Sequence, residues 1–162
     1  MSDSRYGKTI IGELSDAQTL PDGTAVDSTN MVFVGGPTGG QLWINVYAET
    51  AVVIATAQAF SIELQSYSAD TAASAISPFS TSNKGGIPQA TGTSEPDAHY
   101  YLLYKTSADN ELAFAAGDLI TQCAIPEDML RLLSHDYVQL VYTTDATETS
   151  ETVTAFVWIK PS

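Results

Sequence analysis

The sequence predicts an all-β protein, an antiparallel sandwich of two sheets or jelly roll with about eight strands. Short apolar or alternating segments recur along the chain and are separated by turn-forming residues. Charged residues make up only 15% of the chain, while Ser and Thr are abundant, which suits sheet surfaces better than exposed helix faces. No alternation of strands with helical segments is visible, so a parallel α/β sheet is not expected.

The chain has the length of one domain, so residues 1–162 are predicted to form a single unit. Its first thirty residues, 1–30, are polar and rich in turn-formers, which predicts an extended N-terminal arm. The apolar residues inside this segment have no evident regular element to bury them, so the arm orders only by docking. A strand laid along the domain's own sheet is the other interpretation of the same residues.

The first clear strands follow this segment. Met31–Val34 is a short apolar run that ends in a glycine-rich turn at 35–40. Gln41–Glu49 and Ala59–Tyr67 then alternate between apolar and other side chains, as a half-buried antiparallel strand does.

A long segment at 69–98 is biased toward Ser, Thr, Ala, Gly and Pro and is predicted to be a surface loop region. Strands are predicted to resume at His99–Thr106 and Asp118–Ile125. A short helix is expected near 126–133, because Pro stands at a plausible first position with acidic residues directly after it. The last predicted strands are Tyr137–Thr144 and Thr152–Lys160.

Two strands place aromatic residues opposite their aliphatic row: Trp43 and Tyr47 in one, Phe156 and Trp158 in the other. Large apolar rings on the outer face of a sheet are normally covered and not left in water. The cover is either the chain's own loops or another subunit, since aromatic residues are enriched in interface cores. Together with the apolar residues of the N-terminal segment, these rings give a candidate interface that comprises Tyr6, Ile10, Ile11, Trp43, Tyr47, Phe156 and Trp158.

The charge balance narrows the range of partners. Six Lys plus Arg stand against nineteen Asp plus Glu, a formal net charge of −13. Such a chain is repelled by phosphate backbones and by anionic lipid, so neither nucleic acid nor a membrane is an expected partner. The start of the sequence lacks the apolar core of a secretory signal, so synthesis in the cytoplasm is expected, with Cys123, the single cysteine, reduced.

The sequence contains no motif typical of catalysis, such as a phosphate-binding loop or a zinc-protease helix. Cys123 with the His135-Asp136 pair could suggest a thiol nucleophile, but this Cys lies in an apolar strand pattern and fits a small core residue better. His99 is the only other histidine. One Cys and two widely spaced His do not form a closed zinc site. We therefore expect no enzymatic activity, metal or cofactor.

Five segments, taken in order, resemble the small jelly-roll cement (decoration) proteins of tailed-bacteriophage capsids. They are LSDAQTL, TAVDSTNMVFVGG, FSIELQSYSAD, GDLITQCAIPEDMLRLLSHDYVQLVYTT and the closing TVTAFVWIK. The resemblance implies a homotrimer on the outer capsid surface of the virion, with the major capsid protein as its partner. It also implies a structural role without catalysis or cofactor, in which the trimer stabilises contacts between capsomers.

A carbohydrate-binding or tail-fibre module built on a β-sandwich is the alternative. That function requires exposed aromatic rings that form a platform for sugars, and Trp43, Tyr47, Tyr100 and Tyr101 could supply one.

Overall fold

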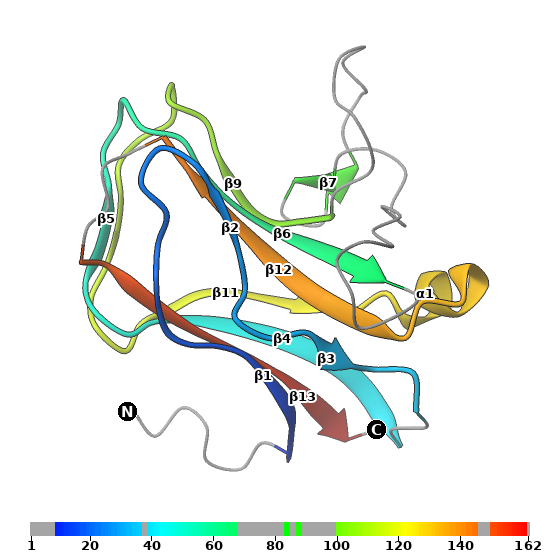
Figure 1. Ribbon diagram of the computed structural model, residues 1–162. Coiled ribbons are helices and arrows are strands. Elements are labelled where there is room, and N and C mark those ends of the chain that lie inside the picture. The colour runs from blue at the N-terminus through cyan, green and yellow to red at the C-terminus, as the bar shows by residue number, and fades with distance from the viewer. Residues whose placement is uncertain are drawn as a thin grey trace.

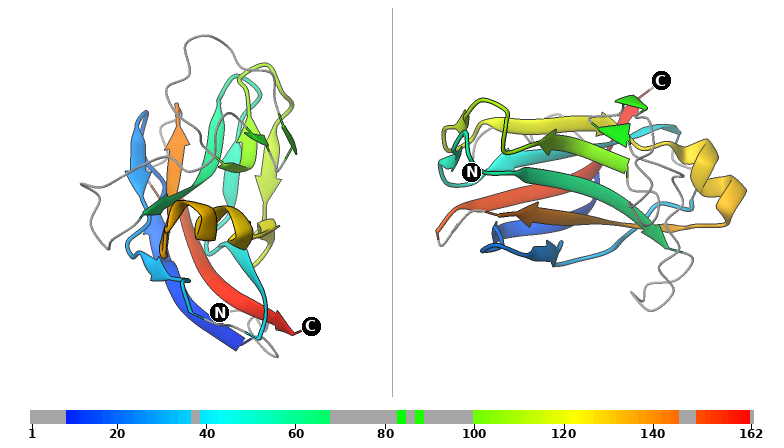
Figure 2. Two further views of the ribbon diagram at one scale, coloured as in Figure 1. Left: turned by 90° about the vertical axis from the view of Figure 1, so that its right-hand side faces the viewer. Right: turned by 90° about the horizontal axis from the view of Figure 1, so that it is seen from above.

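The computed structural model describes residues 9–36, 39–67, 83–84, 87–88, 100–145 and 150–161. Within these residues the chain is an all-β sandwich, as predicted, with two antiparallel sheets packed together (Figures 1 and 2). The first sheet has the strand order β1-β13-β4-β11, with bounds Thr9–Thr19, Thr152–Pro161, Gly40–Ala48 and Leu119–Ala124.

The second sheet faces the first across the core. Its strand order is β2-β12-β6-β9-β7-β8, and β3 also pairs with β12. The bounds are Ala25–Asp27, Tyr137–Thr144, Phe60–Tyr67, Tyr100–Lys105, Asn83–Lys84 and Ile87–Pro88, with β3 at Val32–Phe33. A separate two-stranded sheet joins β5 (Val52–Ile54) to β10 (Leu112–Phe114).

The strand order is that of a jelly roll. The chain crosses repeatedly between the two sheets, so that β1, β4, β11 and β13 form one layer and β2, β6, β9 and β12 form the other. The described residues form more strands than the eight or so predicted, because short strands such as β2 add to the two layers. The short strands β5 and β10 were not predicted, because three residues are too few to show an alternating pattern.

The predicted helix is also present, as α1 (Glu127–Leu133), and it lies at one end of the sandwich (Figure 1). Acidic residues occupy its first turn, where they favour the positive end of the helix dipole. Ser134 ends the helix in the left-handed conformation, and His135 then donates its backbone N–H to the carbonyl of Leu130.

Part of the predicted N-terminal arm is a strand of the domain's own sheet, the second of the two interpretations. β1 pairs with β13 along its whole length, although three register irregularities interrupt the pairing. Leu14 is fully buried, which gives this segment an apolar anchor in the core. A Cβ at Gly12 would lie 2.8 Å from Cγ1 of Val32, so glycine lets β1 pass close to β3. The predicted loop region at 69–98 falls outside the described residues, apart from the short strands β7 and β8.

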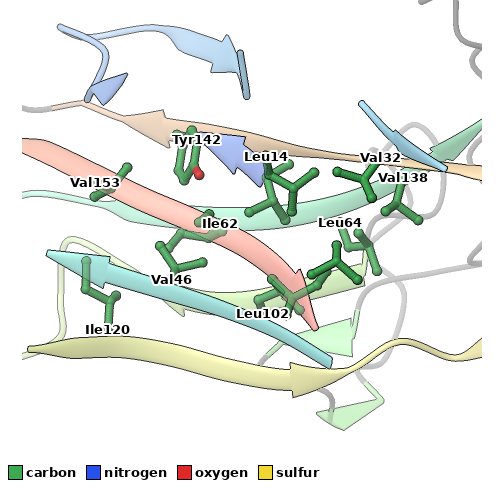
Figure 3. Packing of buried hydrophobic residues seen from close by; sticks show 14 of the residues in the cluster. Leu14, Val32, Val46, Ile62, Leu64, Leu102, Ile120, Val138, Tyr142 and Val153 are labelled. Atoms are coloured by element: carbon green, nitrogen blue, oxygen red, sulfur yellow. The ribbon is translucent and has the colours of Figure 1, made fainter. Parts of the chain in front are cut away.

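The core fills the space between the two sheets. Side chains of both sheets point into this space (Figure 3). It contains mostly aliphatic residues from β4, β6, β12 and β13, such as Ile44, Leu64 and Leu140, each with no exposed surface. A buried polar contact also lies within it, where the hydroxyl of Tyr142 on β12 is 3.0 Å from Oγ of Ser15 on β1.

Candidate interaction surface on the first sheet

Strands β4 and β13 are neighbours, and both alternate between the core and the outer face of the first sheet. Their inward residues belong to the core, whereas Tyr47 and Phe156 are buried without belonging to it. Trp158 pairs with Trp43, and Phe156 pairs with Asn45, so these residues share the outer face. The structure therefore brings together the four aromatic residues that the sequence selected from these two strands.

The four rings form two contacts on this outer face. Tyr47 stacks on Phe156 with ring centroids 5.7 Å apart, and Trp43 lies tilted against Trp158 at 6.3 Å. Phe156 has no exposed surface and Tyr47 retains 8%, whereas both tryptophans are half-buried. A single chain thus already buries the Tyr47–Phe156 pair, and the tryptophan pair remains partly accessible.

Asn45 connects the rings through hydrogen bonds. Its Oδ1 accepts from Nε1 of Trp158 at 2.7 Å and from Nε2 of Gln122 at 2.8 Å. Its amide nitrogen donates to the hydroxyl of Tyr47 at 2.7 Å. Asn45 is fully buried, so these bonds are sheltered from water and fix the orientation of the side chains that they join.

The two tryptophans differ in their hydrogen bonding. Nε1 of Trp158 has Asn45 as its acceptor, but Nε1 of Trp43 is buried and has no acceptor within the described part of the chain. Nζ of Lys160 lies 5.2 Å from the centroid of the Trp43 ring, a cation–π distance. Among the described residues, Trp43 is therefore held by ring contacts, while Trp158 is held by both ring contacts and a hydrogen bond.

The predicted residues of the N-terminal segment join this surface in part. Ile10 pairs with Trp158 across the β1–β13 ladder and is 40% exposed; Ile11 is 38% exposed. On the other side, Ala124 pairs with Trp43 across β11 and β4. Ile10, Trp158, Trp43 and Ala124 therefore form one line across all four strands, which we name the tryptophan row. Tyr6, the remaining predicted residue, lies outside the described residues.

Asn45 and Gln122 belong to this surface, but sequence reasoning did not select them. Asn45 stands two residues from both Trp43 and Tyr47, so alternation alone places its side chain on the same face. That spacing was the available signal. The contact with Gln122 depends on the pairing of β4 with β11, which a single sequence does not specify.

A shallow pocket adjoins one end of this face. It has a volume of about 550 Å³ and is lined by Gly40, Gln41, Ile125, Pro126, Glu127, Asp128 and Arg131. The carboxylate of Glu127 accepts a hydrogen bond from the backbone N–H of Leu42, which ties α1 to the start of β4. Arg131 and Asp128 form an exposed ion pair at 3.5 Å. The first of these contacts joins α1 to the first sheet, and the second lies within the helix.

The residues considered for catalysis are not arranged as a site. Cys123 lies in β11 of the first sheet, where its thiol donates to the carbonyl of Ala124. His135 is buried beside the second sheet, with Nδ1 2.8 Å from Oγ of Ser66. Among the residues that the structure describes, no group of three or more His, Cys, Asp or Glu is placed to hold a metal ion. His99 lies outside these residues.

The four aromatic residues proposed as a sugar platform are divided between the sheets. Trp43 and Tyr47 are on β4 of the first sheet, whereas Tyr100 and Tyr101 are on β9 of the second. Tyr101 is 8% exposed. These residues therefore do not form a common platform.

No protein-family model matches this chain, and no curated protein sequence matches it either. No helix in the described part of the chain has the length and the apolar character needed to span a membrane. Function is therefore inferred from the fold, the charge and the chemistry of the surface.

Proposed function

We propose that this protein is a structural component of a phage virion, which binds the outer surface of the assembled capsid as a homotrimer and stabilises contacts between capsomers. The proposal combines the resemblance of the sequence to capsid cement proteins with the jelly-roll strand order. The observation that supports it most strongly is the set of ordered aromatic rings on the outer face of the first sheet. Among these rings, the two tryptophans of the tryptophan row remain partly accessible. Aromatic side chains fixed in this way are typical of protein–protein contacts.

Binding to the assembled shell would stabilise it by mass action. A protein that binds only the assembled lattice adds contacts that the dissociated capsomers lack. A trimer contacts three equivalent sites together, so weak individual contacts combine through a high effective concentration. The net charge of −13 keeps such a protein soluble and is compatible with a position outside the shell, away from the packaged genome.

The test is to add the purified protein to capsids that lack it and to sediment them. We expect the protein to sediment with assembled capsids but not with unassembled capsid protein. We also expect it to raise the temperature at which the shells disrupt. Failure to bind assembled capsids would contradict the proposal, because no other step of this function can replace that binding.

Carbohydrate binding remains the second candidate, and the half-buried indole rings of Trp43 and Trp158 are the observation that favours it. Sugar rings stack on such surfaces, and jelly rolls also occur in lectins. Retention on immobilised polysaccharide that is lost in a Trp43→Ala variant, without any binding to capsids, would replace the capsid proposal with this one.

A further inference from the structure

We propose that the outer face of the second sheet binds a hard divalent cation of the Ca²⁺ type through side-chain oxygen atoms of Gln139, Asp27 and Glu63. This inference goes beyond the proposed function and does not depend on it. The sequence-based expectation that no metal binds concerned cysteine and histidine, the ligands of zinc. Ca²⁺ instead prefers the oxygen atoms of carboxylates and amides.

The three residues lie together on adjacent strands. Val141 of β12 pairs with Asp27 of β2 on one side and with Glu63 of β6 on the other. The next residue of β12, Tyr142, belongs to the core, so Val141 and its two partners face outward. Gln139 stands two residues before Val141 and therefore lies on the same outer face.

Their side chains can reach a common point. Neighbouring strands lie about 4.8 Å apart, so the backbones at Asp27 and Glu63 are roughly 10 Å apart across β12. Gln139 is displaced from the line between them by roughly 7 Å along its strand. Ca²⁺ binds oxygen at about 2.3–2.6 Å, so two extended carboxylate side chains span this distance with one ion between them.

The side-chain amide of Gln139 points to a ligand. Gln139 is only 7% exposed, and its Nε2 donates to the carbonyl of Ser28 at 3.1 Å. Its Oε1 is buried and has no hydrogen-bond donor in the described part of the chain. Exchanging the two amide atoms would not satisfy the group, because two carbonyl oxygens would then meet at Ser28. A buried acceptor of this kind normally has a donor or a cation bound to it.

The charge of this face favours a cation. Strands β2, β6 and β12 contain no Lys or Arg, and Nζ of Lys105 on the adjacent β9 donates to the carbonyls of Ala55 and Gln58. Burial, and then the negative charge of Asp27, raise the pKa of Tyr67 on β6. The carboxylate of Asp27 therefore acts across β12, the strand that carries the unsatisfied amide oxygen.

Burial limits the size of the cation. Glu63 is 9% exposed and Gln139 is 7% exposed, so a lysine or arginine side chain of another protein has little room to enter. A Ca²⁺ ion is small and accepts about 6–8 oxygen ligands in a flexible geometry, with water completing the set. Mg²⁺ requires a stricter octahedral arrangement and is therefore expected to bind more weakly.

The test is a calorimetric titration of the full chain with calcium chloride, with sodium chloride at the same ionic strength as the control titrant. We expect saturable binding of one Ca²⁺ per chain, with a dissociation constant of about 10⁻⁴–10⁻³ M, the weak end of the range for protein sites. Asp27→Asn keeps the shape of the side chain and removes its charge, so we expect it to weaken binding at least about tenfold. Asp27 is exposed, and circular dichroism checks that the variant is folded. Glu63→Gln gives the same test from β6.

The matched control is Asp22→Asn, which makes the same charge change at an exposed residue between β1 and β2. We expect it to bind Ca²⁺ as the wild type does. Equal weakening by Asp22→Asn and Asp27→Asn would overturn the assignment, because the ion would then respond only to the net charge of −13. The absence of saturable binding would overturn it as well, since a buried water molecule would then be the partner of Gln139.

Discussion

The two faces of the first sheet are both largely buried, but they are built from different chemistry. On β13 the inward residues Val153, Ala155 and Val157 are aliphatic and pack in the core. The outward residues Phe156 and Trp158 are aromatic and take part in the contacts around Asn45. Aliphatic packing is non-directional, whereas hydrogen bonds fix rings at defined orientations. The inner face therefore supplies stability, and the outer face supplies an ordered surface.

The largest expected effect is on the inner face. Ile44→Ala removes a fully buried side chain and leaves a cavity, so we expect the free energy of unfolding to fall by about 2–5 kcal/mol. Urea denaturation measures this change. Ring packing on the outer face should persist in the folded variant, and near-ultraviolet circular dichroism can report on it. A smaller loss of unfolding free energy than in any outer-face variant would contradict the conclusion that the inner face supplies most of the stability.

Asn45→Ala tests the outer face directly. The substitution leaves the indole N–H of Trp158 without its acceptor, and it also removes the contacts to Gln122 and Tyr47. An unsatisfied buried polar group costs about 1–3 kcal/mol, so we expect destabilisation in that range together with altered tryptophan fluorescence. Gln122→Ala, which removes a single bond from an exposed side chain, serves as the control and should change both measurements less.

Tyr142 shows what a polar group does inside the core. Burial raises the pKa of its hydroxyl above the usual value of 10.0, although the hydrogen bond to Ser15 opposes this shift. Below pH 10 the hydroxyl is neutral in both the folded and the unfolded chain, and its contribution to stability is complete. Above pH 10 the unfolded chain ionises first, so the free energy of unfolding should fall by about 1.4 kcal/mol per pH unit from this group.

Tyr142→Phe should lower the free energy of unfolding by about 1 kcal/mol at neutral pH. It should also make the decrease of this free energy above pH 10 less steep. Chemical denaturation at several pH values measures both effects. Ser15→Ala removes the same hydrogen bond but retains the hydroxyl of Tyr142. The free energy of unfolding of this variant should therefore still decrease above pH 10. Equal slopes for the two variants would show that Tyr142 is not the group responsible.

The smallest expected effect separates the two tryptophans. Trp158→Phe loses a buried hydrogen bond to Asn45, whereas Trp43→Phe loses an N–H that has no acceptor in the described part of the chain. We therefore expect Trp158→Phe to be the more destabilising by about 1 kcal/mol, since both variants lose similar ring area. Paired urea titrations give the difference. Equal losses would mean that ring size alone holds the outer face together.

Regular alternation made the central strands predictable. Ala59–Tyr67, Tyr137–Thr144 and Thr152–Lys160 were predicted almost to the residue, because one side of each lies against the core. For β1 the sequence left two interpretations open, an extended arm and a strand of the domain's own sheet, and there is a physical reason for this. Its register shifts, between Ile10 and Gly12 and at two further places, break the period of two that sequence reasoning depends on.

For the candidate surface, the sequence predicted the face on which each residue lies but not the residues beside it. Trp43 and Trp158 could be assigned to outward positions from their own strands, but their contact requires β4 to lie beside β13. The position of Ile10 next to Trp158 likewise depends on a strand pairing between distant parts of the chain. Single-strand patterns specify the face on which a residue lies, while the neighbours of that residue come from the topology.

The pairing of β1 with β13 has a consequence for how the protein folds. Ala17 and Thr154, which share a hydrogen bond between these strands, are 137 residues apart in the chain. During synthesis β1 emerges early but has no partner until β13 has left the ribosome, so the first sheet can close only after nearly the whole sequence shown here has been made. Contacts this distant slow folding, because the entropy of closing the loop is lost before the contact forms.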